Sequence, residues 1–219
     1  MNSYFITGTD TNCGKTYVTC QLLDYFRSKN KRAQALKPLA SGCKENQGIL
    51  ENEDVLNLQK HNSDSSCAIN GWQFAPPISP HLAARESNLK ITAADIATFC
   101  FNEQFTNFDP LLIEGAGGLM VPLNEEETWI DFLQLTKIPV IVVVGLRLGC
   151  INHALLTAEV LKQNQIKVAG WIANCLDENM LSLDDNIATL TNKMQMPLLG
   201  TVSYKGKFNT TSTARMFEL

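Results

Sequence analysis

Short apolar runs separated by longer amphipathic stretches dominate the pattern of hydrophobic and polar positions in this chain. Gly, Pro or charged residues bound six such runs, which are Tyr4–Thr7, Ala33–Leu36, Leu111–Ile113, Val140–Val144, Val168–Ala173 and Leu198–Val202. The run at 140–144 is apolar at every position, which is typical of a strand covered on both faces in a parallel sheet. We therefore expect these runs to be strands that lie between layers of helices.

Helical periodicity occupies the intervals between these runs. In the segments Lys15–Lys29 and Asn152–Asn164, apolar residues recur on one face at helical spacing. Weaker periodicity predicts two further helices, at Ala93–Phe105 and Leu183–Met194. Because strands alternate with helices, the sequence predicts an α/β fold with a doubly wound, mainly parallel sheet and helices on both faces. No linker divides the chain, so we expect one domain over residues 1–219.

Two segments lack either period. The polar stretch Ser41–Pro80 predicts a long irregular insertion, and such insertions are usually functional or mobile. Within it, Ser79-Pro80-His81 has the composition of a turn. The tail Lys205–Leu219 has no clear periodicity, so we expect it to be loosely held. Asn152 is expected to be the N-cap of the helix that follows the run at 140–144, or the free amides at that helix start can hold a carboxylate.

The composition is that of an ordinary globular protein. The chain has 219 residues and 24.3 kDa, with 45% hydrophobic and 18% charged residues and a mean hydropathy of -0.06. These values exclude the disordered and fibrous classes. Eighteen Lys and Arg against 22 Asp and Glu give a net charge of -4, so we expect no nucleic-acid partner and no membrane partner.

Several features of the sequence favour a cytoplasmic protein. The first residues lack a basic stretch followed by an apolar one, so we expect no signal peptide. The longest apolar run, Ile138–Leu146, is far shorter than the ~20 residues that span a bilayer. The seven cysteines show neither a C-x-x-C pair nor zinc-ligand spacing, which favours reduced and buried thiols.

Residues 8–16 carry a phosphate-binding motif. Their sequence, GTDTNCGKT, matches G-x-x-x-x-G-K-[ST] in full and lies between a predicted strand and a predicted helix. Glycines let the backbone curl so that its amides point at a phosphate chain, and the helix N-terminus adds about half a positive charge. Lys15 is expected to reach the outer phosphates, and the hydroxyl of Thr16 is expected to bind Mg²⁺.

Charged residues follow two of the other predicted strands. Glu114 comes directly after the run at 111–113 and before the small residues GAGG at 115–118, so it can supply the acidic metal contact of a phosphate loop. Lys37 follows the second run, and parallel strands end at one shared edge of a sheet. Lys37 can therefore neutralise a second anion there, or it can be a solvated lysine. Asp54 opens a helical stretch and is either a helix N-terminal charge or a metal ligand.

Taken together, these segments resemble the dethiobiotin synthetase family. The resemblance rests on residues 8–16, Lys37-Pro38, Ala40-Ser41-Gly42, Asp54, Ser79-Pro80-His81, residues 114–118, 149–154 and 169–174. They follow the family's order from residue 4 to about residue 202, which is nearly the whole chain. The phosphate loop alone is generic, whereas the segments at 37–38, 114–118 and 149–154 together are specific.

The resemblance implies an ATP- and Mg²⁺-dependent cyclo-ligase of biotin biosynthesis. Such an enzyme takes up CO₂ as a carbamate on one amine of 7,8-diaminononanoate. The γ-phosphoryl group of ATP passes to the carbamate to give a mixed anhydride, and the second amine closes the ureido ring. The resemblance also implies a homodimer in which the second subunit completes the site for the substrate carboxylate.

The resemblance assigns roles to individual residues. Catalytic roles are implied for Lys37, Lys15 and Thr11, and magnesium contacts for Thr16, Asp54 and Glu114. Nucleotide contacts are implied for Asn12, Cys13, Gly14, Lys15, Thr16, Tyr17, Asp54, Glu114, Gly115, Ala116, Gly117, Asn174 and Cys175. Substrate contacts are implied for Thr11, Lys37, Ser41, Gly118, Cys150, Ile151 and Asn152. The chain departs from the family at Asn12, where relatives commonly have Glu, and at Ser203-Tyr204, where they often have Pro-Trp.

Two other functions are compatible with this fold. An amide ligase of the cobyric acid synthase type would need a glutamine-hydrolysing domain, for which 219 residues leave no room. A partitioning ATPase usually carries an extra lysine early in the loop, and Thr9-Asp10-Thr11 has none. Slow ATP turnover without a diamine, together with binding to DNA or liposomes, would favour the partitioning ATPase.

Overall fold

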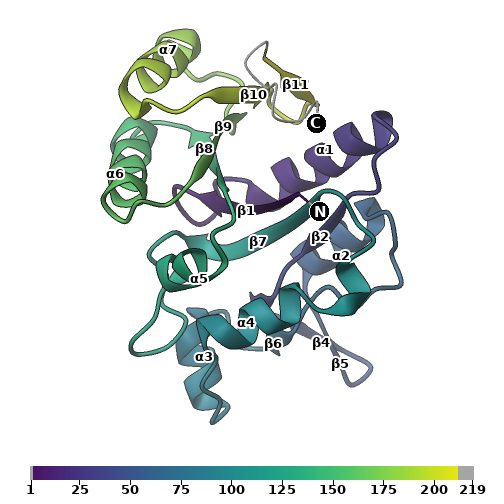
Figure 1. Ribbon diagram of the computed structural model, residues 1–219. Coiled ribbons are helices and arrows are strands. Elements are labelled where there is room, and N and C mark those ends of the chain that lie inside the picture. The colour runs from purple at the N-terminus through teal and green to yellow at the C-terminus, as the bar shows by residue number, and fades with distance from the viewer. Residues whose placement is uncertain (1, 212–219) are drawn as a thin grey trace.

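A seven-stranded sheet forms the centre of the structure, a computed structural model that describes residues 2–211 (Figure 1). Its strand order is β11-β10-β9-β8-β1-β7-β2, and every pair is parallel except β10 with β11. The strands are β1 (Ser3–Gly8), β2 (Gln34–Leu36), β7 (Leu111–Gly118), β8 (Val140–Leu146), β9 (Val168–Cys175), β10 (Leu198–Val202) and β11 (Phe208–Thr210). All six predicted strands are confirmed.

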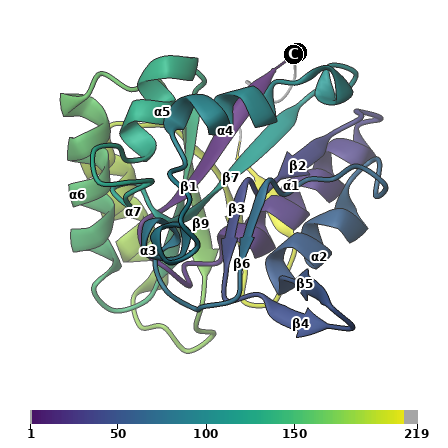
Figure 2. The same cartoon turned by 90° about the horizontal axis from the view of Figure 1, so that it is seen from below.

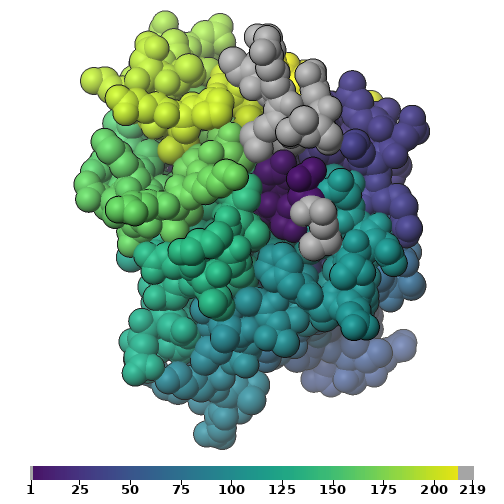
Figure 3. Space-filling view, viewed as in Figure 1, coloured from purple at the N-terminus to yellow at the C-terminus, as the bar shows by residue number. Residues whose placement is uncertain are grey.

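Helices cover both faces of this sheet. They are α1 (Lys15–Ser28), α2 (Glu53–His61), α3 (Pro80–Glu86), α4 (Ala93–Cys100), α5 (Trp129–Thr136), α6 (Cys150–Gln163) and α7 (Leu183–Met194). The helix α1 packs against α2 on one face, whereas α4 with α5 and α6 with α7 lie on the other (Figure 2). Figure 3 shows one face of the molecule with its atoms drawn at full size, and the start of the chain, in purple, is visible near its centre. The predicted doubly wound α/β fold is confirmed.

Burial is deepest at the centre of the sheet. Every residue of β8 is buried, as its unbroken apolar run predicts. The ring of Phe5 on β1 lies 5.1 Å from that of Trp129 and 5.6 Å from that of Phe132, both on α5. Burying these two α5 rings contributes roughly 3–6 kcal/mol. The indole of Trp129 also donates a hydrogen bond to the carbonyl of Ala116 (3.1 Å), so α5 holds the glycine-rich end of β7 in place.

The prediction of a long irregular insertion was wrong for about half of the segment 41–80. The segment contains the hairpin of β4 (Lys44–Asn46) and β5 (Ile49–Glu51), the helix α2, and β6 (Trp72–Phe74), which pairs with β3 (Leu39–Ser41). These strands have three residues each, too few to show a period of two. The residues Ser79-Pro80-His81 form no isolated turn, because Pro80 is the first residue of α3.

Two helix boundaries and the tail also differ from their predictions. The helix α6 begins at Cys150, and Gly149 at φ 92° takes the N-cap position that was predicted for Asn152. The helix predicted at 93–105 ends at Cys100 and is followed by a short 3-10 turn, Glu103–Phe105. The tail is not loosely held at 208–210, because these residues form β11, which pairs with β10. Residues 212–219 of the tail lie outside the described part of the chain.

Six of the seven cysteines are buried, as the sequence predicts. All seven are free, and all are buried except Cys67, which is partly exposed. In the described residues, no helix combines the length and the apolar character that crossing a bilayer requires.

Candidate active site

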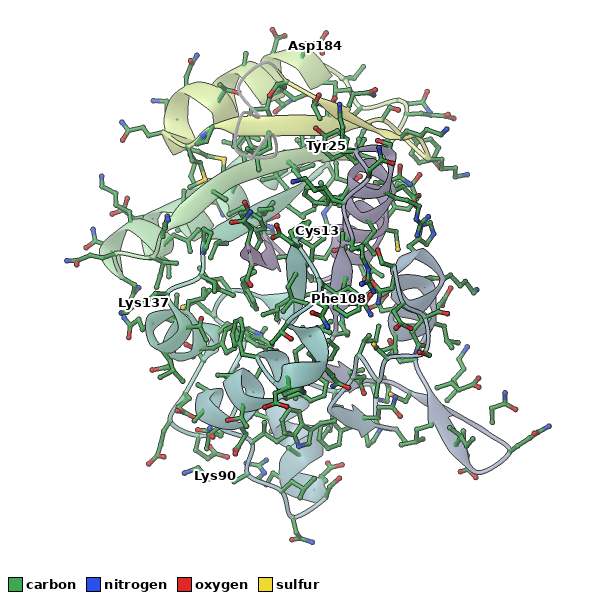
Figure 4. The ribbon with its side chains drawn as sticks, turned by 45° about the vertical axis from the view of Figure 1, so that its right-hand side comes forward. Cys13, Tyr25, Lys90, Phe108, Lys137 and Asp184 are labelled. Carbon is green, nitrogen blue, oxygen red and sulfur yellow. The ribbon has the colours of Figure 1, made fainter. Side chains whose placement is uncertain are left out.

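The phosphate loop joins the end of β1 to the start of α1. Gly14 is the N-cap residue of α1 at φ 86°, a left-handed conformation that favours glycine. A Cβ atom there would collide with the side-chain amide of Asn174, and one at Gly8 would collide with the sulfur of Cys13. Cys13 itself lies in the interior of the molecule (Figure 4). The glycines therefore let the loop pack tightly and leave the first amides of α1 free for an anion.

Lys15 lies over this loop. Its side chain is largely buried, and its ammonium group donates a hydrogen bond to the carbonyl of Asp10 (3.2 Å). Burial lowers the pKa of Lys15 below its ordinary value, and the nearby ammonium of Lys37 lowers it further. An anion placed between the two lysines would relieve this repulsion.

Glu114 is a fully buried carboxylate on β7, with none of its surface exposed. Its Oε1 accepts hydrogen bonds from the hydroxyl of Thr16 (2.6 Å) and from the ammonium of Lys37 (2.7 Å). Its Oε2 lies 2.9 Å from the hydroxyl of Thr19. A buried charge needs such partners, because an unpaired carboxylate would be strongly destabilising.

Lys37 links Glu114 to Asp54. Its side chain is 6% exposed, and its ammonium lies 3.1 Å from Oδ2 of Asp54. Burial opposes the charge of Lys37, but the carboxylates of Glu114 and Asp54 outweigh it and raise its pKa. For Asp54, burial likewise opposes the charge, and the ammonium of Lys37 outweighs burial and lowers the pKa. The structure therefore brings together the two lysines and the three predicted metal contacts.

The backbone of Lys37 is also anchored. Its amide donates to the carbonyl of Ile69 (2.9 Å), and the side-chain amide of Asn70 donates to the carbonyl of Lys37. These contacts fix the strand end from which the ammonium group reaches Glu114. No local pattern in the sequence indicates Asn70, because its role depends on a contact across 33 residues.

The donor set suits magnesium. Thr16, Glu114 and Asp54 offer a hydroxyl and two carboxylates, the hard oxygen ligands that Mg²⁺ prefers while keeping several waters. Among the described residues, no group of three or more His, Cys, Asp or Glu side chains gathers into a metal site. A site of few carboxylates beside a phosphate loop is typical of magnesium that is shared with a nucleotide.

A cavity of about 580 Å³ lies over these groups. The predicted residues that line it are Thr11, Asn12, Gly14, Lys15, Thr16, Tyr17, Lys37, Asp54 and Gly117. It is also lined by five residues that sequence reasoning missed, Cys20, Gln21, Glu53, Asn57 and His61. These five lie on α1 and α2, and a helical signal does not show which helices pack together. The cavity has room for a triphosphate and a small second substrate.

A smaller cavity of about 170 Å³ lies beside the first and shares Gly14 and Tyr17 with it. Asn174, Cys175 and Tyr204 line this cavity, as do Leu176 and Lys205. The side-chain amide of Asn174 donates to the carbonyl of Cys13 (2.9 Å). Asn174 therefore ties β9 to the phosphate loop.

Other predicted residues lie apart from the large cavity. Cys13 belongs to the phosphate loop, but its side chain is buried. Ser41 is the last residue of β3, and the first turn of α6 contains Cys150, Ile151 and Asn152. Of the run at 115–118, Gly117 lines the cavity, whereas Gly115 packs against the ring of Phe5. Ala116 accepts the hydrogen bond of Trp129, and Gly118 pairs with Gly8 in the sheet.

Comparisons with solved structures place the fold. The cell division protein FtsY of Thermotoga maritima has a TM-score of 0.53 at 15% identity, covering 99% of this chain and 67% of that one. Chloroplast FtsY of Physcomitrella patens has a TM-score of 0.56 at 15% identity, covering 99% and 64%. A family model described as an AAA domain matches residues 2–212. With the loop geometry, these findings define a P-loop NTPase fold.

Curated relatives narrow this class to one family. The ATP-dependent dethiobiotin synthetase BioD of Legionella pneumophila (strain Corby) is 55% identical over 209 residues, which cover 95% of this chain and 97% of the relative. The protein of the same name from Marinobacter nauticus is 41% identical over 218 residues, covering 98% and 92%. The chain belongs to the dethiobiotin synthetase family, which confirms the resemblance noted from its motifs.

Proposed function

We propose that this protein catalyses the ATP-dependent ring closure of 7,8-diaminononanoate with CO₂ to dethiobiotin in biotin biosynthesis. The observation that carries the proposal is the convergence of Lys15, Lys37 and the phosphate loop on one cavity. ATP and a carbamate are both anions, and bringing them together costs electrostatic energy. Two ammonium groups and inward backbone amides offset that repulsion, so catalysis rests on positioning and charge stabilisation.

The proposed reaction has three steps. One amine of the substrate takes up CO₂ to give a carbamate, with loss of a proton. A carbamate oxygen then attacks the γ-phosphorus of ATP, which forms a mixed carbamic-phosphoric anhydride and releases ADP. The second amine attacks the carbonyl carbon, a C–N bond forms, and phosphate leaves with the shared oxygen. Lys15 stabilises the charge on the transferring phosphoryl group, and Lys37 stabilises the charge on the carbamate.

Magnesium fits this proposal. Thr16, Asp54 and Glu114 would hold the ion, which when bound neutralises charge on the phosphate oxygens. Thr11 and Ser41 are proposed to contact the substrate amine, because Thr11 lines the cavity and Ser41 ends a strand beside Lys37. The cysteines, which the structure leaves free, suit a protein of the cytoplasm.

A homodimer is part of the proposal. Cys150, Ile151 and Asn152 do not line the cavity of their own chain, so they are proposed to bind the substrate carboxylate of a second subunit through the helix start of α6. Leu148, two residues before this turn, is fully exposed, and an apolar side chain in that position favours a partner surface.

Subunit complementation tests the shared site. Lys37→Met and Asn152→Asp should each be inactive alone, the second because its charge repels the carboxylate. A 1:1 mixture should recover about a quarter of the wild-type rate, since half of the dimers are mixed and each has one intact site. If the mixture stays inactive while ultracentrifugation shows dimers, the result would contradict a site shared between subunits.

Product analysis tests the reaction. Protein, Mg²⁺, ATP, ¹³C-bicarbonate and 7,8-diaminononanoate should give the cyclic urea with one ¹³C, detected by mass spectrometry, and one phosphate per urea. With ¹⁸O-labelled CO₂, the released phosphate should carry ¹⁸O, because the anhydride passes one carbamate oxygen to it. Phosphate release without urea, or release that is indifferent to the diamine, would contradict the proposal.

A further inference from the structure

The two oxygens of the buried Glu114 carboxylate have different partners. Oε1 accepts from the Thr16 hydroxyl and the Lys37 ammonium, both of which line the large cavity. Oε2 lies 2.9 Å from the Thr19 hydroxyl, which is the hydrogen-bond partner of this oxygen among residues 2–211. Oε1 is therefore the oxygen that faces the proposed metal and nucleotide, and Oε2 faces the body of α1.

Thr19 reaches Glu114 because of its place on α1. It lies three residues after Thr16, so both side chains share one face of the helix. Its side chain is fully buried, and its hydroxyl lies 2.9 Å from two acceptors, the carbonyl of Lys15 and Oε2 of Glu114. A hydroxyl has one proton to donate. The ionised carboxylate is the stronger acceptor, and burial makes an unsatisfied carboxylate oxygen costly.

We propose that Thr19 is a positioning residue, whose hydrogen bond to Oε2 sets the plane of the Glu114 carboxylate and turns Oε1 toward the divalent cation. The inference rests on the magnesium-dependent function proposed above. When a cation engages Oε1, the ammonium of Lys37 and the hydroxyl of Thr16 no longer hold the carboxylate as they do in this structure. Thr19 then remains as the group that fixes its orientation, a role that outer partners of metal-binding carboxylates commonly have.

Two conservative substitutions separate positioning from packing. Thr19→Val keeps the shape of the side chain and removes the hydroxyl, whereas Thr19→Ser keeps the hydroxyl and removes a methyl group. Binding of Mn²⁺ to the full chain with a non-hydrolysable ATP analogue is measured by electron paramagnetic resonance, and thermal unfolding without metal serves as the control. A packing defect lowers the unfolding temperature, and a positioning defect weakens Mn²⁺ binding.

Thr19→Val should weaken Mn²⁺ binding about tenfold or more, the scale on which removing such an outer partner acts, while Thr19→Ser should stay close to wild type. The Mg²⁺ concentration for half-maximal turnover should rise in parallel in Thr19→Val, with little change in the KM for the diamine. If Thr19→Val does not fold, Thr19→Ala takes its place with the same expected losses.

Two outcomes would overturn the inference while leaving the proposed function standing. One is wild-type Mn²⁺ affinity in a folded Thr19→Val or Thr19→Ala variant. The other is an equal loss in Thr19→Ser and Thr19→Val, which would point to packing. Failure of the wild-type protein to bind Mn²⁺ with the nucleotide analogue would overturn this inference together with the magnesium part of the proposed function.

Discussion

Replacing Lys37 with alanine removes the ammonium group that pairs with Glu114 and Asp54 in the site. Turnover should fall by ~10²–10³, the effect of removing one preorganised charge-stabilising donor, which corresponds to about 2.7–4 kcal/mol of transition-state stabilisation. The fold should lose stability as well, because Glu114 is buried and its ammonium partner, 2.7 Å away, is gone. Breaking a buried pair costs about 3–5 kcal/mol, and the hydroxyls of Thr16 and Thr19 keep this case near 3 kcal/mol.

A loss of about 3 kcal/mol lowers the unfolding temperature of a chain of this size by about 6–12 °C. Initial rates of urea formation at 20 °C, well below unfolding, separate the loss of turnover from the loss of stability. Lys37→Met is the matched control, because it keeps most of the length of the side chain without its charge and should show the same loss of turnover. Near wild-type turnover in a folded Lys37→Ala variant would refute the reasoning.

Three further substitutions test other parts of the account. Gly14→Ala should cost at least 1–2 kcal/mol, since φ is 86° and the new methyl group meets Asn174, and calorimetry should show a lower unfolding temperature. Because the folded pKa of Asp54 lies below 3.8, its ionised form stabilises the fold above that pH. The stability difference between wild type and Asp54→Asn should therefore be constant near neutral pH and shrink as pH falls below about 3.8, in urea titrations. Burial raises the pKa of Cys20 to about 12, so a thiol reagent at pH 8 should leave Cys20 unmodified and react first with the partly exposed Cys67. A fast phase that persists in Cys67→Ser would contradict this order.

The sequence predicted the sheet and the phosphate loop because both signals are local. The strand at 140–144 is apolar at every position, so both of its faces must be buried under other elements. The glycines at 8 and 14 belong to one contiguous motif. Parallel strands have their carboxyl ends at one edge of the sheet, so the sequence also predicted that Lys37 and Glu114 can meet there. The two side chains are in contact in the structure.

The remaining parts depend on contacts between distant segments. Thr19 acquires a partner through a hydrogen bond to a residue 95 positions away, and its own neighbours in sequence show only a buried helix face. The helix α5 has eight residues, too few for a clear period, and the Phe5 ring on another element fixes its position. The helix α6 begins earlier than predicted because its N-cap is Gly149, which has a left-handed backbone conformation and no capping side chain. The sequence prediction looked for a capping side chain and therefore chose Asn152.

A crystal structure with a non-hydrolysable ATP analogue, Mg²⁺, 7,8-diaminononanoate and bicarbonate tests the central claim most directly. The account predicts that the ammonium groups of Lys15 and Lys37 both lie within about 3.2 Å of oxygens of the bound nucleotide and carbamate, with Lys37 moved from Asp54 toward its anion. An ammonium of Lys37 that points away from the carbamate, out of reach of any ligand that Lys15 contacts, would contradict it.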